Sequence, residues 1–321
     1  MPLWYAPGMT EKRSLALRTD FLAPGTSLTT PDLLRSFLEG RKETTFKTYR
    51  AALKVFAEFL DVESVEVACH RLLTLPHGAA NKVALDYRNW LIGKDYSAAT
   101  INNRLAAIRA VVDMGRTVGV IPWRLEVKSV REERYRDTAG PGEDKIIAQI
   151  QGLAKENDPK SARDAAILAL MGLMGLRRGE VISLDLKDYE SGILRIIGKG
   201  HTDPEPLTVP PEIQKLIDRW IEYRGSDAGP LFWYFRGLAL FPKRLSDRSV
   251  GRITNGLDLG HAHGLRHSAI TQALDDHHGD LRKVARFSRH KNIQTLLRYD
   301  DNRQDLGGEV AQGLARKLKE D

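Results

Sequence analysis

Apolar residues recur every three to four positions through the first third of the chain, which is the spacing of amphipathic helices. We expect one helix to begin at Thr30, where Pro31 and Asp32 suit a first turn, and a second to contain residues 49–60. Two more are expected near 79–92 and 97–118. The clearest apolar stripes are Tyr49, Leu53, Phe56 and Leu60, and then Ile101, Leu105, Ile108 and Val112. Four helices with short connections predict a small helical bundle.

The second half of the chain mixes helical and alternating patterns. Helices are expected near 144–153 and 161–175, followed by a strand at 192–197. Gly198-Lys199-Gly200 then predicts a turn, after which Leu207–Val209 can return as a partner strand. Beyond Pro210 the pattern is helical again. The fold class is therefore predicted as mainly α with a small β-sheet.

A charged segment separates the two halves. Residues 128–142 contain several arginines and end in Ala-Gly-Pro-Gly, with few apolar side chains, which is typical of a linker. We predict a flexible arm at 1–28, a helical domain at 29–127 and a second domain at 143–321. Near the C-terminus, Gly307-Gly308 predicts a hinge before a short tail helix. Its apolar stripe is Val310, Leu314 and Leu318.

The composition restricts the class of protein. Hydrophobic residues make up 42% and charged residues 28% of the 321 residues, as in globular proteins. No apolar run approaches the roughly 20 residues that cross a bilayer, and the first residues lack the apolar core of a signal peptide. We therefore expect a cytoplasmic protein without a membrane partner. The single cysteine, Cys69, excludes a disulfide within the chain and disfavours a cysteine metal site.

The charge is unevenly distributed. The net charge is +7, and residues 1–137 hold 21 basic against 16 acidic residues, which is most of the excess. A basic surplus favours a polyanionic partner, although alone it is a weak signal. The candidate DNA contacts on the polar helix faces of this part are Lys47, Arg50, Asn102, Arg104 and Arg109.

Four short segments of the second domain carry reactive side chains, and each has an ordinary explanation when taken alone. Arg177 and Glu180 suit a solvated ion pair, and Lys199 suits a surface turn. The His263-Gly-Leu-Arg-His cluster lacks a third close metal ligand, and a lone Tyr299 near the C-terminus suits packing. Four further histidines are interpreted as structural or surface residues: His261, His267, His277 and His278.

Taken together and in order, these residues suit attack on a phosphodiester without a metal ion. Two arginines can clamp the non-bridging oxygens and remain charged. Histidines can donate hydrogen bonds or move a proton, and a lysine can protonate the leaving oxygen. A tyrosine hydroxyl can act as a nucleophile that forms a covalent intermediate.

At this point the sequence resembles the tyrosine recombinases, or phage-type integrases, over about residues 28–300. The matching segments are Gly-Leu-Arg-x-x-Glu at 175–180, Gly-Lys-Gly at 198–200, His-x-x-Arg at 263–266, and the run from 290 to 299. The resemblance implies that the catalytic residues are Arg177, Lys199, His263, Arg266, His290 and Tyr299, with Glu180 as a support for Arg177. One departure is visible, because Ser288-Arg289 stands where the family usually has Leu-Gly.

The resemblance also implies an architecture and an activity. The helical core-binding domain and the catalytic domain would form a C-shaped clamp around double-stranded DNA, as a homo-tetramer on two DNA sites. Tyr299 would form a 3′-phosphotyrosine, with no cofactor, metal or ATP. Three alternatives remain: a type IB topoisomerase-like activity, a telomere resolvase, and a non-catalytic DNA-binding protein of the same fold.

Overall fold

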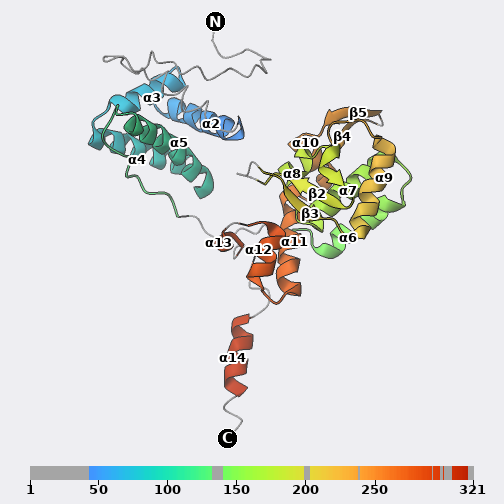
Figure 1. Cartoon of the computed structure of the whole chain (residues 1–321). Helices are drawn as coiled ribbons and strands as arrows, with labels where there is room; N and C mark the ends of the chain where they lie inside the picture. Colours follow the sequence, from blue (N-terminus) through green and yellow to red (C-terminus); the bar gives the residue numbers. More distant parts are fainter. Residues whose placement is uncertain are drawn as a thin grey trace. The chain divides into compact units, whose positions relative to one another are not determined.

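The chain divides into two compact units, Met1–Glu133 and Arg134–Asp321 (Figure 1). The computed structural model describes residues 43–131, 140–198, 203–237, 239–290, 292–296, 299 and 306–316. The expected arm at 1–28, the helix expected at Thr30 and the Lys199 turn lie outside these ranges. None of the helices in the described ranges is both long and apolar enough to cross a bilayer.

The first unit is built from four described helices around one apolar core. These are α2 (Glu43–Phe59), α3 (Val65–Thr74), α4 (His77–Gly93) and α5 (Ala98–Thr117). The expected stripes point inward, since Leu53, Phe56, Leu105 and Ile108 are at most 1% exposed. Helix α3 was not predicted. The Ser64 hydroxyl caps it by accepting a hydrogen bond from the Val67 amide.

The extended segment at 127–130, after α5, packs on the same unit. Val127 is buried in its core and Val130 packs against it. The Asn102 side chain makes two hydrogen bonds to the backbone of Val130, from its Nδ2 to the carbonyl at 2.9 Å and from the amide to its Oδ1 at 2.8 Å. Arg109 binds the Val127 carbonyl and Ser129 Oγ. The first residues of the expected linker are therefore packed on α5.

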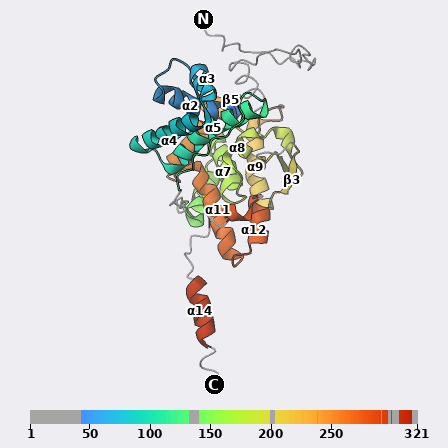
Figure 2. The same ribbon diagram turned by 90° about the vertical axis from the view of Figure 1, so that its left-hand side faces the viewer.

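The second unit has α7 (Pro159–Gly172) at its centre, with every residue from Ala162 to Gly172 buried. Helices α6 (Glu143–Lys155), α9 (Pro211–Arg224) and α11 (Ala262–Asp276) pack against it. Figure 2 shows α9 and α11 beside α7. Gly172 allows this close packing, because a Cβ there would lie 2.6 Å from Ile146 Cγ2. The expected helices near 144–153 and 161–175 correspond to α6 and α7.

Two small sheets complete the core, and the fold is mainly helical as expected. The antiparallel order β1–β2–β3 joins Tyr189–Glu190, Ile193–Ile196 and Glu205–Thr208, so the hairpin expected around Lys199 is present. A second hairpin pairs β4 (Trp233–Arg236) with β5 (Ala239–Arg244). The helical pattern expected beyond Pro210 is confirmed by α9 but is wrong at 233–244, because the aromatic side chains of β4 pack on the core as a strand.

The second unit also contains shorter helices. They are α8 (Arg178–Ser183), α10 (Asp247–Gly256), α12 (Leu281–Ser288), α13 (Ile293–Leu296) and α14 (Leu306–Arg316). The hinge expected at Gly307-Gly308 is wrong, because both glycines lie within α14. Along this amphipathic helix Val310 is 65% and Leu314 60% exposed, while Leu318 lies outside the described residues.

Candidate active site

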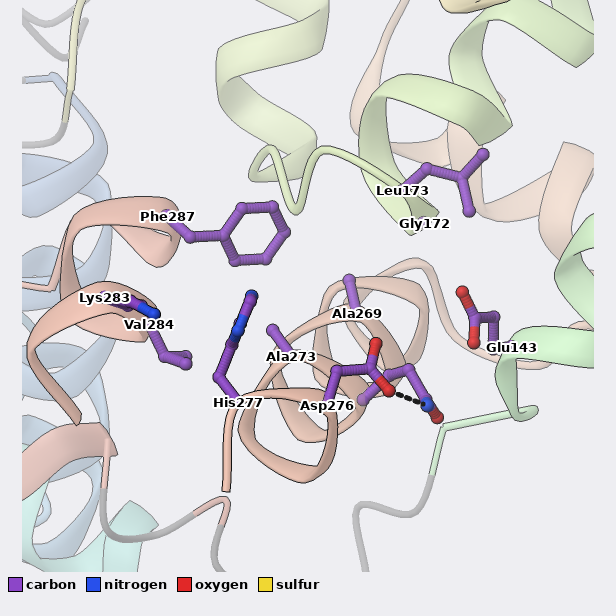
Figure 3. Close-up of a pocket in the computed structure, with 11 residues that line it drawn as sticks. Glu143, Gly172, Leu173, Ala269, Ala273, Asp276, His277, Lys283, Val284 and Phe287 are labelled. Atoms are coloured by element: carbon purple, nitrogen blue, oxygen red, sulfur yellow. Dashed lines mark hydrogen bonds between the residues drawn. The ribbon is translucent and has the colours of Figure 1, made fainter. Parts of the chain in front are cut away.

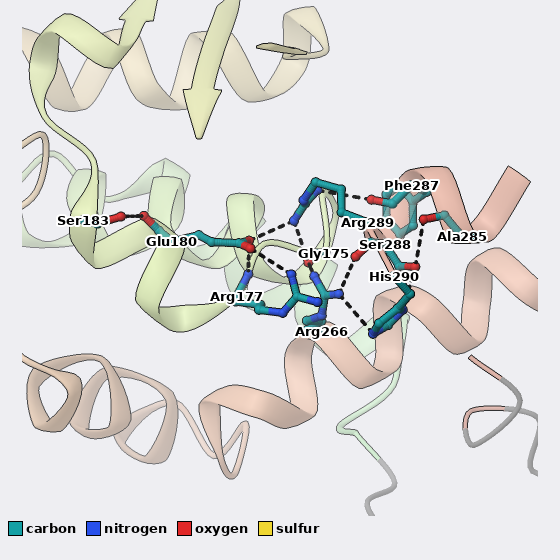
Figure 4. Close-up of polar contacts among 10 residues, drawn as sticks. All are labelled: Gly175, Arg177, Glu180, Ser183, Arg266, Ala285, Phe287, Ser288, Arg289 and His290. Atoms are coloured by element: carbon teal, nitrogen blue, oxygen red, sulfur yellow. Dashed lines mark hydrogen bonds and ion pairs between the residues drawn. The ribbon is translucent and has the colours of Figure 1, made fainter. Parts of the chain in front are cut away.

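The first arginine of the site stands at the beginning of α8. Gly175 has a φ of +60°, which glycine adopts without strain, and the chain then turns so that Arg177 becomes the N-cap residue. The Arg177 amide donates to Glu180 Oε2 at 2.8 Å, and its Nη1 donates to Glu180 Oε1 at 2.9 Å (Figure 4). Glu180 therefore holds both the backbone and the side chain of Arg177.

The Glu180 carboxylate is buried but well compensated. Burial alone would raise the pKa of Glu180, but the hydrogen bonds from Arg177 and the charges of Arg289 and Arg177 outweigh it and hold the pKa below its usual value. Its side chain is 4% exposed, whereas that of Arg177 is 31% exposed. Arg177 thus reaches solvent while its supporting carboxylate stays inside.

Helix α11 supplies the second arginine. Arg266 is 1% exposed, and its guanidinium donates to the backbone carbonyls of Gly175 and Ser288. Burial, with the charges of Arg177 and Arg289, lowers the pKa of Arg266 to about 10, so that it remains charged at neutral pH. One side chain therefore ties the turn before α8 to the end of α12.

The two expected histidines are neutral at neutral pH. Partial exclusion of water lowers the pKa of His263, and the charges of Arg266, Arg177 and Arg178 lower it further. Burial, followed by the charges of Arg266, Arg177 and Arg289 and by His263, lowers the pKa of His290 to about 4. A negative phosphate beside these rings would favour the charged form and raise both pKa values.

The expected nucleophile lies among these groups. Tyr299 is 8% exposed and packs on a small core with Leu296 and Ile270. Its ring centroid lies 5.6 Å from that of His290 and 4.8 Å from that of His267. The tyrosine is therefore held by ring contacts from α11 and from the segment after α12.

The fold brings most of the expected catalytic residues together, although they span more than a hundred positions. Side chains from α8, α11 and the end of α12 point toward one another in Figure 4, linking Arg177, Glu180, Arg266 and His290. His263 is close enough to influence the pKa of His290. Lys199 lies outside the described residues. Within the described ranges, no three His, Cys, Asp or Glu side chains gather as a metal site would require.

The expected DNA contacts of the first unit have different surroundings. Lys47 and Arg50 lie on α2. On α5, the Arg104 guanidinium lies over the Tyr96 ring, 3.6 Å from its centroid. Asn102 and Arg109 hold the segment at 127–130, as described above. Nothing in these contacts tests a role in DNA binding.

Three residues of the site were not predicted. His267, interpreted as structural or surface, is 4% exposed and packs on the Tyr299 ring, with its Nδ1 3.3 Å from Thr271 Oγ1. Ser288 and Arg289 contact His290 and Glu180 directly. Their departure from Leu-Gly was the only sequence signal. His261 and His278 are exposed, as is His277.

A groove of about 270 Å³ lies beside the same helices (Figure 3). Phe287 lines it and also lies under the turn before α8, because a Cβ on Gly175 would be 3.2 Å from its ring. The remaining lining residues come from α6, α7, α11 and α12. His277, at the end of α11, belongs to this groove rather than to the arginine cluster.

Comparisons with known proteins agree with this geometry. The phage integrase family model matches residues 144–305. A tyrosine recombinase of Synechococcus elongatus is 34% identical over 302 residues, which cover 89% of this chain and 94% of that protein.

Two solved structures share the fold. XerH recombinase, in a post-cleavage complex with its palindromic difH substrate, has a TM-score of 0.60 at 18% identity, covering 89% of this chain and 84% of that one. A lambda integrase tetramer bound to a Holliday junction has a TM-score of 0.56 at 16% identity, covering 89% and 81%. The family match over half of the chain and the extensive identity to a curated relative show that this chain belongs to the phage integrase family of tyrosine recombinases, enzymes that cut and rejoin DNA strands.

Proposed function

We propose that this protein recombines specific DNA sites by attack of the Tyr299 hydroxyl on a backbone phosphate. The attack forms a 3′-phosphotyrosine and releases a 5′-hydroxyl, which can then attack the phosphotyrosine of a partner strand. The energy of the phosphodiester bond is kept in the protein–DNA linkage, so neither step requires ATP. The convergence of Arg177, Arg266 and His290 beside Tyr299 is the observation that carries the proposal.

The surroundings of each side chain support a separate role. Arg177 is exposed enough to meet a phosphate, and guanidinium groups can donate two parallel hydrogen bonds to its oxygens. Arg266 is charged and held rigidly, so its field is already in place when negative charge develops on the phosphate. His263 and His290 are neutral in the free protein and can accept a proton, and a bound phosphate, which raises the pKa of both rings, would let them return it. We assign protonation of the leaving oxygen to Lys199, which lies in the sequence between β2 and β3.

The partner proposed is double-stranded DNA held between the two domains in a C-shaped clamp. XerH and lambda integrase, which share the fold, were both solved on DNA, and the latter as a tetramer. We extend that assembly to this chain as a homo-tetramer on two sites. The proposed DNA contacts of the first domain remain Lys47, Arg50, Asn102, Arg104 and Arg109, and the proposed location is the cytoplasm.

A nicked suicide substrate tests the chemistry. The unaltered protein is expected to form a covalent adduct on denaturing gels in excess EDTA, because two arginines can replace a metal as the phosphate clamp. Tyr299→Phe keeps the ring but has no attacking oxygen, so it should bind the same DNA and form no adduct. Tyr223→Phe, on α9, is the matched control and should behave as the unaltered protein.

The outcomes separate the alternatives. An adduct that survives in Tyr299→Phe would mean that another residue is the nucleophile, and cleavage restored only by magnesium would indicate a metal nuclease. DNA binding without any adduct would favour the non-catalytic protein. Relaxation of supercoils without strand exchange would favour the topoisomerase, and hairpin products the telomere resolvase.

A further inference from the structure

The pair Ser288-Arg289 ends α12 between two groups of the active site, and the following inference rests on the proposed function. Arg289 adopts a φ of 55° and a ψ of 40°, a left-handed conformation that is costly for a residue other than glycine. The contacts of the Arg289 side chain therefore have to compensate for the cost of this backbone conformation.

The Arg289 guanidinium connects three segments of the site. Its Nη2 donates to Glu180 Oε2 at 2.9 Å and to the Gly175 carbonyl at 3.4 Å, and its Nη1 donates to the Phe287 carbonyl at 3.2 Å. The side chains of this ion pair are 7% and 4% exposed, so water does not screen it strongly. Arg289 thereby joins the end of α12 to the beginning of α8.

This ion pair affects how Arg177 is held. Arg289 and the Arg177 amide share Glu180 Oε2, which leaves Oε1 for Arg177 Nη1. Among the residues that the structure describes, neither Nη2 nor Nε of Arg177 has a hydrogen-bond partner. The guanidinium is therefore oriented through one nitrogen, with its other donors available to a phosphate.

Ser288 determines the proton position on His290. The Ser288 hydroxyl donates to the Val284 carbonyl at 2.6 Å, because a carbonyl oxygen can only accept. The same oxygen lies 2.8 Å from His290 Nδ1, so it must accept from an Nδ1–H. On the other side of the ring, Arg266 Nη2 lies 3.4 Å from Nε2 and can only donate. Both partners require the same tautomer, protonated on Nδ1 with a lone pair on Nε2.

We propose that Ser288 and Arg289 are positioning residues of this recombinase: Ser288 holds His290 as the Nδ1–H tautomer, and Arg289 fixes Glu180 so that Arg177 presents its open donors to the scissile phosphate. Each acts through another residue, and neither is assigned a contact with DNA. The leucine and glycine usual at these positions could make neither contact, so this chain uses a different support for the same catalytic groups.

Substitutions at 289 test the arginine. Arg289→Gly and Arg289→Asn both suit the left-handed backbone but lack the guanidinium. We expect either to lower the cleavage rate at saturating DNA by on the order of 10-fold to 100-fold, since misplaced catalytic groups are that costly, with the Kd for DNA unchanged. Arg289→Lys restores the charge and should recover part of the rate. Arg286→Asn, on the exposed side of α12, is the matched control.

A double-mutant cycle tests whether Arg289 affects the cleavage rate through Glu180. If Arg289 acts through Glu180, Arg289→Asn should have a much smaller effect in the Glu180→Gln background than in the unaltered protein. Full additivity of the two changes, or an unchanged cleavage rate in Arg289→Gly, would overturn the assignment of Arg289. Equal loss of cleavage and of DNA binding would show a merely structural role and overturn it as well.

Nitrogen-15 NMR of labelled histidine tests the serine without any cleavage reaction. In the free protein at pH 7, His290 should show a protonated Nδ1 and an unprotonated Nε2. Ser288→Ala removes the acceptor of the Nδ1–H at 2.8 Å and leaves only the longer 3.4 Å contact from Arg266 to Nε2. The Nδ1 signal should therefore lose its hydrogen-bonded shift and the Nε2–H tautomer should gain population, with the melting temperature recorded to verify folding. An Nε2–H tautomer in the unaltered protein, or an unchanged spectrum in Ser288→Ala, would refute the role of Ser288. Because this measurement needs no DNA, its failure is distinct from failure of the proposed recombinase activity.

Discussion

The two arginines of the proposed clamp are held in different ways, and their environments decide what each can do. Arg177 is about one-third exposed and is tied to one carboxylate, whereas Arg266 is buried and tied to two backbone carbonyls. A lysine preserves charge but lacks the planar fork that makes such paired contacts. The same substitution at the two positions should therefore have different consequences.

Arg177→Lys and Arg266→Lys are both expected to lower the cleavage rate by about 10²–10³, the usual effect of losing one preorganised donor. Only Arg266→Lys should also lower the free energy of unfolding, by about 1–3 kcal/mol, because it leaves buried carbonyls without a donor. Single-turnover cleavage and urea unfolding measure the two effects. Equal stability of both variants would contradict the anchoring role of Arg266.

The lowered pKa values of the histidines predict how stability depends on pH. The folded pKa of His290 is about 4, against an ordinary value of 6.5, so between these values the unfolded state binds more protons. Stability should therefore be complete above about pH 6.5 and decline as the pH falls toward 4.

His290→Gln removes this group, so its melting temperature should change less between pH 7 and pH 5 than that of the unaltered protein. His263, whose pKa is also lowered, will contribute to the slope that remains. His278→Gln is the matched control, because His278 is exposed and lies outside the segments 263–266 and 290–299. Identical slopes for His290→Gln and the unaltered protein would contradict the low pKa of His290.

At the scale of elements, the expected linker is packed at both of its ends. Residues 127–130 are fastened to α5, and at the other end the Gly142 amide donates to Ser268 Oγ on α11 at 3.1 Å. Gly140 approaches the same helix so closely that a Cβ would lie 2.2 Å from the Gly264 carbonyl. This helix also carries His263 and Arg266, so the end of the linker packs directly on the helix that bears part of the candidate active site.

Asn102→Ala should distinguish a fastening role from a DNA contact. It removes both hydrogen bonds to Val130, so we expect the free energy of unfolding to fall by about 1–2 kcal/mol in the absence of DNA. Asn103→Ala, on the exposed face of the same helix, serves as the comparison and should leave stability unchanged. A stable Asn102→Ala protein with weakened DNA binding would support the original interpretation of Asn102 as a DNA contact.

At the scale of the whole molecule, helix α14 has an exposed apolar face and is too short to be stable by itself. A helix of 11 residues is marginal in water, and Val310 and Leu314 on it are largely exposed. Burying that face on another subunit would link the protomers of the proposed tetramer, whereas burying it on its own domain would not.

Deletion of residues 309–321 is therefore expected to preserve binding to a single DNA site and to weaken cooperative assembly on two sites, together with recombination. Gel-shift titrations on one-site and two-site DNA measure this. Val310→Ser with Leu314→Ser should reproduce the defect at full length, which shows that the apolar face is responsible. Unchanged cooperativity and a full recombination rate would mean that α14 does not connect subunits.

The sequence by itself determined helices α2, α4 and α5 of the first unit, α6 and α7 of the second, and the β2–β3 hairpin, because periodicity is a local property. It also indicated the catalytic residues by their types and order, and that assignment stays a prediction. It could not predict α3 or the β4–β5 hairpin, whose short segments form through contacts with the core. Only the tertiary structure placed His267 on the Tyr299 ring and Arg289 on Glu180. Residues so far apart in the chain meet only after folding. The left-handed backbone at 289 favours glycine, so the sequence gives no reason for an arginine there. The reason is the ion pair with Glu180, which only the tertiary structure shows.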